Sequence, residues 1–212
     1  MSESGLVQQI GRKGADQGEI ADEVIQRPEL LAGVLAGLAS DKARIKYGCD
    51  KVLRIISERK PEILYPEIEL FIGLLDSDST FLKWGAIHIL ANLAVVDSEG
   101  KIEQIFDKYF SPVTGPVLIT AANVIKGAAV IALAKPELTE RITAELLKVE
   151  DGRYQTAECR SIALGHTIRA FDRFYHQIKD REPVNRLVTR QLQNTRNATR
   201  KAAERFVKKK LT

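Results

Sequence analysis

Aromatic and basic side chains lie one helical turn apart at two places in this sequence. Tyr47 is followed by Lys51, and Trp84 is followed by His88. Residues four positions apart share one face of a helix. Such a face can hold a ring or an apolar side chain of a partner while its cation contacts a carboxylate or a phosphate. These pairs predict a binding surface, although Trp84 could instead pack between adjacent helices.

The C-terminal part of the chain is strongly basic. Residues 153–212 carry 15 Lys and Arg against 5 Asp and Glu, whereas residues 1–152 carry 17 against 23. A basic stripe can bind several phosphates, and such binding weakens as salt is added. Alternatively, these cations form a solvated cap on the last unit of a stack. The predicted anion contacts are Arg186, Arg190, Arg196, Arg200, Lys208 and Lys209.

Groups suited to catalysis or metal binding are sparse. His166 and His176 do not have the i, i+4 spacing of a metal-binding pair on a helix. Cys49 and Cys159 lack a neighbouring histidine and a C-x-x-C partner, and they fall at positions expected to face the core. The sequence also contains no phosphate-binding glycine loop with a Lys-Ser/Thr ending. We therefore predict no catalytic residue, no metal and no cofactor.

Five segments of the sequence can be aligned with one another. At spacings of 37, 37, 40 and 40 residues, they begin at Ile45, Leu82, Ile119, Cys159 and Thr199. A period of this length is typical of helical solenoids, in which each unit buries its apolar face against the next. In the first two segments the apolar residues recur at i, i+4, i+7, i+8 and i+11. This spacing indicates one buried stripe along a helix.

Prolines and turn residues predict a first and a second helix in each repeat. The first helices are expected at 28–39, 61–75, 99–110, 136–149 and 183–194. The second helices are expected at 41–58, 79–96, 116–134, 154–177 and 196–210. Because 116–134 is apolar on nearly every face, it must be buried, either within the stack or against another chain. The domain prediction is a flexible or loosely helical leader over 1–19 and a single repeat domain over 20–212.

Residues 64–86, LYPEIELFIGLLDSDSTFLKWGA, resemble a HEAT repeat. The similarity lies in an internal proline (Pro66), a leucine-rich helix end, an Asp-containing turn and an aliphatic–basic pair before a small residue. It extends more loosely over roughly residues 28–210, and the third repeat departs from it with Thr120 at the basic position. The resemblance implies an all-α, right-handed, armadillo-like α-solenoid of about five HEAT-like helix pairs. It implies little about function, because HEAT proteins include scaffolds, transport factors, bilin lyase subunits and a DNA glycosylase family.

In such a solenoid, the positions two and six residues after each aligned start are expected on the concave face. In the third and fourth repeats these positions hold Ala121, Ile125, Ser161 and Gly165. Arg160 occupies the basic position of its repeat, which in HEAT-like repeats usually ties neighbouring repeats together. With Arg160 included, the predicted concave-face contacts are Tyr47, Lys51, Trp84, His88, Arg160, Lys201 and Arg205.

These observations predict a non-catalytic HEAT-like scaffold or adaptor that binds a protein or peptide on its concave face. The alternative is a nucleic-acid-binding protein that uses the basic C-terminal repeats and stacks Trp84 on a base. An enzyme such as a DNA glycosylase or a bilin lyase component is a third alternative. The glycosylase reaction needs a carboxylate beside the aromatic residues, and the residue one turn after Trp84 is His88. The oligomeric state and the identity of the partner stay open.

The cytoplasm is the expected location. The N-terminal residues do not combine a basic stretch with an apolar one, as a secretory signal would. The longest apolar stretch, 116–134, is interrupted by Asn123 and Lys126, so it is interpreted as a buried helix and not as a membrane span.

Overall fold

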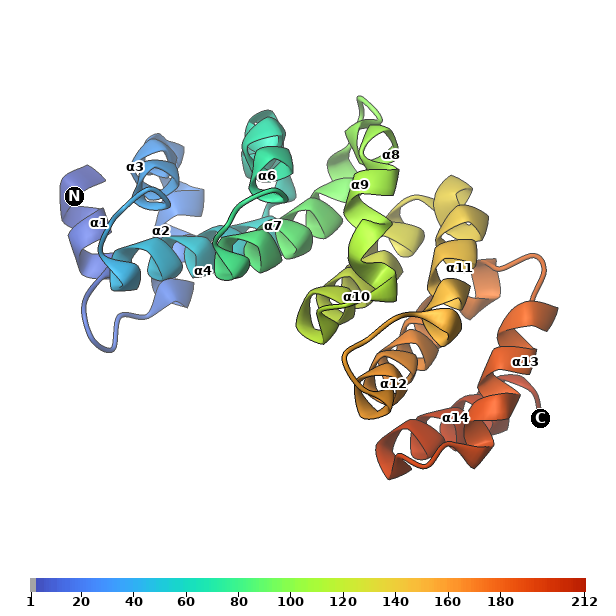
Figure 1. Ribbon diagram of the computed structural model, residues 1–212. Helices are drawn as coiled ribbons and strands as arrows, with labels where there is room; N and C mark the ends of the chain where they lie inside the picture. The colour runs from blue at the N-terminus through green and yellow to red at the C-terminus, as the bar shows by residue number, and fades with distance from the viewer. Residues whose placement is uncertain (1–2) are drawn as a thin grey trace. The chain divides into compact units, whose positions relative to one another are not determined.

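The computed structural model describes residues 3–212, and within this range it contains helices and turns but no strand (Figure 1). The predicted all-α class is confirmed. Backbone contacts divide the chain into two compact units, of which the first ends at Glu99 and the second runs Gly100–Thr212. No helix within the described range is long and apolar enough to cross a membrane. The single repeat domain and the cytoplasmic location both stay predictions.

The first unit contains two N-terminal helices and two helix pairs. The N-terminal helices are α1 (Glu3–Ile10) and α2 (Gln17–Gln26). The first pair joins η1 (Pro28–Leu30) and α3 (Leu31–Gly37) to α4 (Ala43–Arg59). The second pair joins α5 (Pro61–Leu64), η2 (Tyr65–Glu67) and α6 (Ile68–Leu74) to α7 (Thr80–Leu93) and η3 (Ala94–Val96).

The predicted leader includes Met1 and Ser2, which lie outside the described residues. The part of it that follows contains α1 and the start of α2. Helix α1 packs against α3 and α4, and α2 packs against α4. Leu6 and Ile10 of α1 are buried. These contacts make α1 part of the apolar core of the first unit.

The second unit contains three helix pairs. The first joins α8 (Lys101–Gln104), α9 (Phe106–Phe110) and η4 (Ser111–Thr114) to α10 (Leu118–Ala134). The next joins η5 (Pro136–Leu138), α11 (Thr139–Leu147) and η6 (Lys148–Asp151) to α12 (Ala157–Phe174) and η7 (Tyr175–Gln177). The last joins α13 (Glu182–Arg190) and η8 (Gln191–Gln193) to α14 (Asn197–Lys210).

All ten predicted helices are therefore present, with ends that differ from the predicted ones by a few residues. One first helix is divided by a 3-10 turn that contains proline, Pro66 in η2, and two others begin with such a turn, η1 and η5. Proline has no backbone N–H to donate and its ring crowds the preceding turn, so it interrupts an α-helix.

The predicted turn residues act just before the helices. Ser40 accepts a hydrogen bond from Lys42 N at 3.2 Å, and Asn194 accepts one from Arg196 N at 2.9 Å. Neither α4 nor α14 has a side-chain hydrogen bond at its N-cap. These two residues therefore stabilise the turn that leads into the helix.

The second helices form the core of each unit. Helix α4 packs against α7, α10 against α12, and α12 against α14 (Figure 1). The predicted stripe is confirmed on α4 for Cys49, Val52, Leu53 and Ile56, which are all buried, while Ile45 at its start is only partly buried. Cys159 on α12 is only partly buried.

Polar ties between successive helix pairs recur at about the repeat period. Lys51 donates to Gln17 at a separation of 34 residues, and Asn92 donates to Ser57 at 35. In the second unit, Arg196 donates to Glu158 at a separation of 38 residues. Side chains at equivalent sequence distances thus join neighbouring pairs.

Candidate binding surfaces

Three aromatic rings gather on the second helices of the first unit. The ring centroid of Phe81, on α7, lies 4.9 Å from that of Tyr47 on α4 and 5.4 Å from that of Trp84 on α7. Phe81 is 57% exposed and Tyr47 is 39% exposed, while Trp84 is half-buried. We call Tyr47, Phe81 and Trp84 the aromatic cluster. Contiguous exposed apolar surface of this kind marks sites of interaction in folded proteins.

Close packing of α4 against α7 brings these rings together. A Cβ atom on Gly85 would lie 2.7 Å from Cγ of Asp50, so any larger residue would force the two helices or the carboxylate to move. Asp50 is only 7% exposed, and it pairs with Arg54 Nε at 3.2 Å. Burial raises the pKa of Asp50 to about 6, and the positive charge of Arg54 opposes that shift.

The polar residues predicted to accompany the rings lie on the same two helices. Lys51 is exposed on α4, and its Nζ donates a hydrogen bond to Oε1 of Gln17 at 3.2 Å. His88 is half-buried on α7, one turn after Trp84. In the first unit, two predicted contacts, Tyr47 and Trp84, therefore belong to the aromatic cluster, and two others, Lys51 and His88, lie one turn further along the same helices. Phe81 is the member of the cluster that the sequence did not predict.

The predicted strip does not continue at the expected positions of the second unit. Ala121 and Ile125 on α10 are fully buried, and Gly165 on α12 is buried as well. A Cβ atom on Gly165 would lie 2.8 Å from Oγ1 of Thr199 on α14. The repeat alignment placed Ile119 of α10 toward the core, but this side chain is 53% exposed. The alignment of the third repeat is therefore corrected.

This error has a physical cause. An amphipathic helix has one apolar stripe that determines which face turns inward. Helix α10 is apolar on nearly every face, so its pattern does not select one orientation. The prediction that this helix is buried is confirmed for most of its residues, since it packs against α11, α12 and η4.

Three further predicted contacts are exposed in the second unit. Lys201 and Arg205 lie one turn apart on α14, and Nε of Arg205 donates to the carbonyl oxygen of Lys201 at 3.1 Å. Arg160 is exposed in the first turns of α12, near Tyr154. Burial raises the pKa of Tyr154 to about 12, and the positive charge of Arg160 opposes the shift.

Most of the predicted anion contacts form ion pairs within the unit. Nε of Arg190 donates to Glu150 at 2.8 Å, and Nε of Arg196 donates to Glu158 at 2.8 Å. Both pairs join one helix pair to the next, so these cations already have a structural use. Three other predicted anion contacts also form ion pairs: Lys209 with Asp172 at 3.0 Å, Arg186 with Glu182 at 3.9 Å and Arg200 with Glu204 at 3.9 Å. Lys208 is exposed and forms no ion pair with the described residues.

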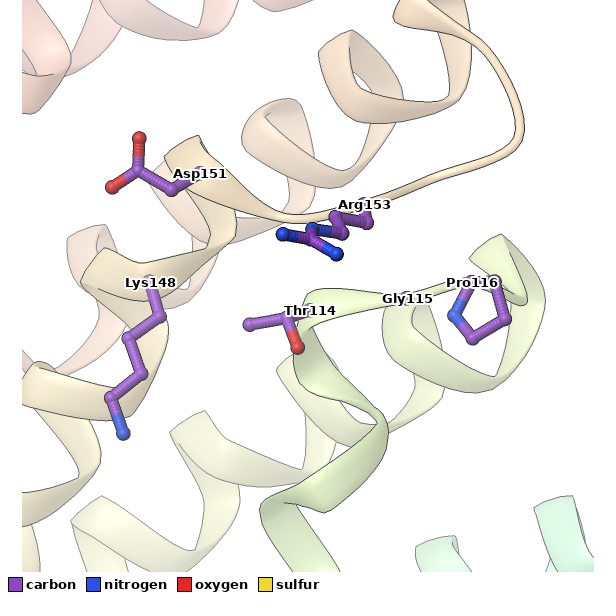
Figure 2. A pocket seen from close by; sticks show the side chains of 6 residues that line it. All are labelled: Thr114, Gly115, Pro116, Lys148, Asp151 and Arg153. Carbon is purple, nitrogen blue, oxygen red and sulfur yellow. The ribbon is translucent and has the colours of Figure 1, made fainter.

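Two loops of the second unit enclose an open hollow of about 440 Å³, shown in Figure 2. Gly115 has a φ of 100°, and a Cβ there would lie 2.6 Å from the carbonyl oxygen of Arg153. Arg153 N donates to Thr114 O at 2.8 Å, and the Arg153 guanidinium lies between Thr114 and Asp151 (Figure 2). The lining residues carry both signs of charge, so the hollow favours no one class of ligand. They are Thr114, Gly115, Pro116, Lys148, Asp151 and Arg153.

Comparison with known proteins gives the fold. No protein-family model matches the chain, and no curated protein matches it. Among solved structures, the designed armadillo repeat protein YIII(Dq)4CqI is 16% identical, with a TM-score of 0.60 over 97% of this chain and 92% of its own. The chain has an armadillo-like α-solenoid fold. The predicted solenoid is thereby confirmed, whereas membership of the HEAT family in particular is not.

Two other similar structures have names that mention peptides. One is a computationally designed armadillo repeat protein for modular peptide recognition, 13% identical, with a TM-score of 0.56 over 97% of this chain and 90% of its own. The other is designed armadillo repeat protein YIII(Dq.V1)4CPAF in complex with peptide (KR)4, 15% identical, with a TM-score of 0.52 over 97% and 90%. At these identities the shared property is the fold.

Sequence reasoning missed three exposed residues of the second helices: Phe81, Lys126 and Arg169. Phe81 lies one position before an aligned start, so the repeat pattern assigned it no role. Lys126 offered a clearer signal, because it is the only charged residue in α10 and its ammonium group must reach water. The surroundings of Arg169 include residues of α14, about 35 positions further along the chain, so no local sequence pattern identifies them.

Proposed function

We propose that this chain is a non-catalytic, HEAT-like scaffold that binds an extended peptide segment of a partner protein on the exposed faces of its second helices. The aromatic cluster carries the proposal. Its rings lie on two neighbouring helices, and Phe81 leaves more than half of its surface in water. Large aromatic side chains dominate the energy of protein interfaces when a partner buries them.

The remaining predicted contacts have subsidiary parts in this proposal. Lys51 and His88 flank the rings and provide the polar rim that surrounds an apolar anchor in most interfaces. Arg160, Lys201 and Arg205 are separate candidate contacts on the second helices of the second unit. The names of two similar designed proteins refer to peptide recognition or to a bound peptide, which supports the same use of this fold.

The structural elements that hold the rings are suited to binding without rearrangement. Tyr47 and Trp84 lie inside long helices whose packing is fixed by the contact between Gly85 and Asp50. A surface that is already ordered loses less conformational entropy when a partner binds, and it therefore retains more of the contact energy as affinity.

A selection experiment tests the proposal. The wild-type protein is used to select from a phage-displayed library of short random peptides, and we expect enrichment of peptides that carry an aromatic or long aliphatic residue. Replacing Phe81 by Ala should weaken the enriched peptides by at least about thirtyfold, the size expected for an anchor residue. Because Phe81 is largely exposed, the same change should lower the free energy of unfolding by less than about 1 kcal/mol.

Val95→Ala is the matched control, since Val95 is 64% exposed on η3 of the same unit and lies outside the cluster. It should leave peptide affinity unchanged. Absence of enriched peptides, or equal affinity loss in both variants, would contradict the proposal.

A further inference from the structure

Three exposed cations lie on successive second helices of the second unit. Lys126 is on α10, Arg169 is on α12 and Arg205 is on α14. Helix α10 packs against α12, and α12 packs against α14, so the three helices lie side by side (Figure 1). We call Lys126, Arg169 and Arg205 the cation row.

The positive charges of Lys126 and Arg169 act on His166 of α12, and the charge of Arg205 acts on Arg169. Burial, together with the charges of Arg169, Lys126 and Arg196, lowers the pKa of His166 to about 4. Burial likewise lowers the pKa of Arg169, with the charges of Arg196 and Arg205 adding to the effect. Cations from all three helices therefore share one region of positive potential.

No carboxylate of the described residues forms an ion pair with any member of the row. This distinguishes the row from Arg190 and Arg196, which pair with Glu150 and Glu158. Arg205 uses Nε to bind the carbonyl oxygen of Lys201, which leaves its other guanidinium N–H groups for a ligand. Positive charges without a paired carboxylate repel one another, and an anionic ligand would relieve that repulsion.

The row also has a concave part. Arg169 and Arg205 line a hollow of about 120 Å³ between α12 and α14. Its other lining residues include Ile168, Ala202 and Phe206, which give it an apolar floor. A short acidic side chain entering this hollow would place its methylene groups on the floor and its carboxylate beside a guanidinium group. Asp172 also lines the hollow, but its charge is offset by Lys209 and Lys210 at 3.0 and 3.5 Å.

We propose that the cation row binds an acidic, extended peptide segment of a partner protein, with one carboxylate for each helix. This inference rests on the proposed peptide-binding function and names the chemistry of the partner in the second unit. Packed helices lie roughly 8–10 Å apart. A polyproline II segment has three residues per turn and rises about 9 Å per turn, so Glu or Asp at every third position would meet successive cations.

The surroundings of the row favour a peptide over a nucleic acid. Single-stranded nucleic acids are held largely by stacking of bases on exposed aromatic rings. In residues 100–212 no Phe, Tyr or Trp side chain is exposed: Tyr154 is half-buried and the rest are buried, namely Phe106, Tyr109, Phe110, Phe171, Phe174, Tyr175 and Phe206. The peptide named in one similar designed protein is the basic (KR)4, and the charge of the row here requires the opposite composition.

Fluorescence anisotropy with defined probes tests this inference. The probe is a labelled synthetic peptide with Glu at every third position and Ser or Pro between. We expect saturable binding at low salt that weakens as salt is added. Arg169→Gln/Arg205→Gln should weaken it by at least about tenfold, and Lys126→Gln by a smaller factor. A peptide of the same composition with its Glu residues adjacent to one another should bind more weakly.

The matched control is Lys148→Gln/Lys179→Gln, which removes the same charge from exposed positions of the second unit outside the second helices. It should change affinity by less than about twofold. Equal losses in the two double variants would overturn the inference, as would failure of the Glu peptide to bind at low salt. Tighter, row-dependent binding of single-stranded oligothymidylate would replace the acidic peptide by a nucleic acid.

The two proposals fail in different ways. If only the cation-row inference is wrong, peptides selected from the random library still bind through the aromatic cluster, and Phe81→Ala still weakens them. If the library yields no peptide and the Glu peptide also fails to bind, both proposals are wrong.

Discussion

The two units present opposite chemistry on the same structural element. The first unit, residues 1–99, has 11 Lys and Arg against 16 Asp and Glu, a net charge of −5; the second, residues 100–212, has 21 against 12, a net charge of +9. On the second helices of the first unit the exposed groups include aromatic rings, whereas in the second unit they include the cation row and no aromatic ring of Phe, Tyr or Trp. Packing constrains only the inner stripe of each helix, so the outer faces of related repeats are free to acquire different partners.

Both units use glycine to bring second helices close together, and the tightness of that contact differs. Gly85 faces the short, buried side chain of Asp50, and Gly165 faces the hydroxyl of Thr199. Thr199 also donates a hydrogen bond to Ser161 O at 2.6 Å. The first unit thus buries a carboxylate at its helix contact, where the second unit buries a neutral hydroxyl.

The largest effect is expected from Gly85→Ala. The new methyl group would overlap the Asp50 carboxylate, so we expect the free energy of unfolding to fall by about 3 kcal/mol. Urea denaturation measures this. In an Asp50→Ala background the clash is absent, and Gly85→Ala should cost much less. Gly73→Ala is the control, since a Cβ there meets nothing within 4 Å, and the change should be neutral or stabilising.

The equivalent change in the second unit should be milder. Gly165→Ala places a Cβ 2.8 Å from the Thr199 oxygen, a weaker overlap than at Gly85, so we expect a loss of about 1–2 kcal/mol. A loss at Gly165 as large as that at Gly85, measured in the same urea series, would remove the distinction between the two helix contacts.

Acidification should stabilise the first unit through Asp50. Its pKa is about 6 in the folded protein against 3.8 for the free group, so the folded state binds a proton more readily. Stability from this group is therefore highest below pH 4 and falls as pH rises through 6. Between pH 4.5 and 7.5 the wild type should lose about 2 kcal/mol relative to Asp50→Asn. A constant difference between the two proteins across this range would refute the assignment.

His166 should produce the opposite pH dependence in the second unit. Its pKa is lowered from 6.5 to about 4 by burial and neighbouring cations, so the unfolded state binds the proton more readily. The stability that this group contributes is present above pH 6.5 and is lost as pH falls toward 4. Thermal melts of His166→Gln should show a weaker loss of stability than the wild type over this range. If the stability of the two proteins changed with pH in parallel, the lowered pKa of His166 would be contradicted.

The smallest effect is expected for the exposed ion pairs. Arg190→Gln breaks a pair with Glu150, and we expect a change of less than about 1 kcal/mol in the free energy of unfolding. Glu150→Gln and the double variant complete a cycle that isolates the pair. A coupling energy well above this value would show that the ties between helix pairs contribute more to stability than surface pairs usually do.

The sequence predicted the helices well because their signals are local. Apolar spacing on α4 and α7 indicated the buried stripe, and prolines such as Pro136 marked where first helices begin. The signals that failed were those that depend on a neighbour. Helix α10 has no single stripe, so its orientation came from the helices packed around it. The ion pairs of Arg190 and Arg196 join residues 40 and 38 positions apart, and no local pattern predicts them.

By itself, the sequence determined the all-α class, the repeat period and the inner stripe of each regular repeat, because these follow from helical periodicity along one chain. Tyr47 and Trp84 could be identified as surface candidates for the same reason. Only the tertiary structure decided that Phe81 completes the aromatic cluster. It also decided that Arg190 and Arg196 form ion pairs with glutamates, whereas Lys126, Arg169 and Arg205 form no ion pair with a described carboxylate. Those outcomes depend on which helices become neighbours, and that is settled by packing between residues far apart in the chain.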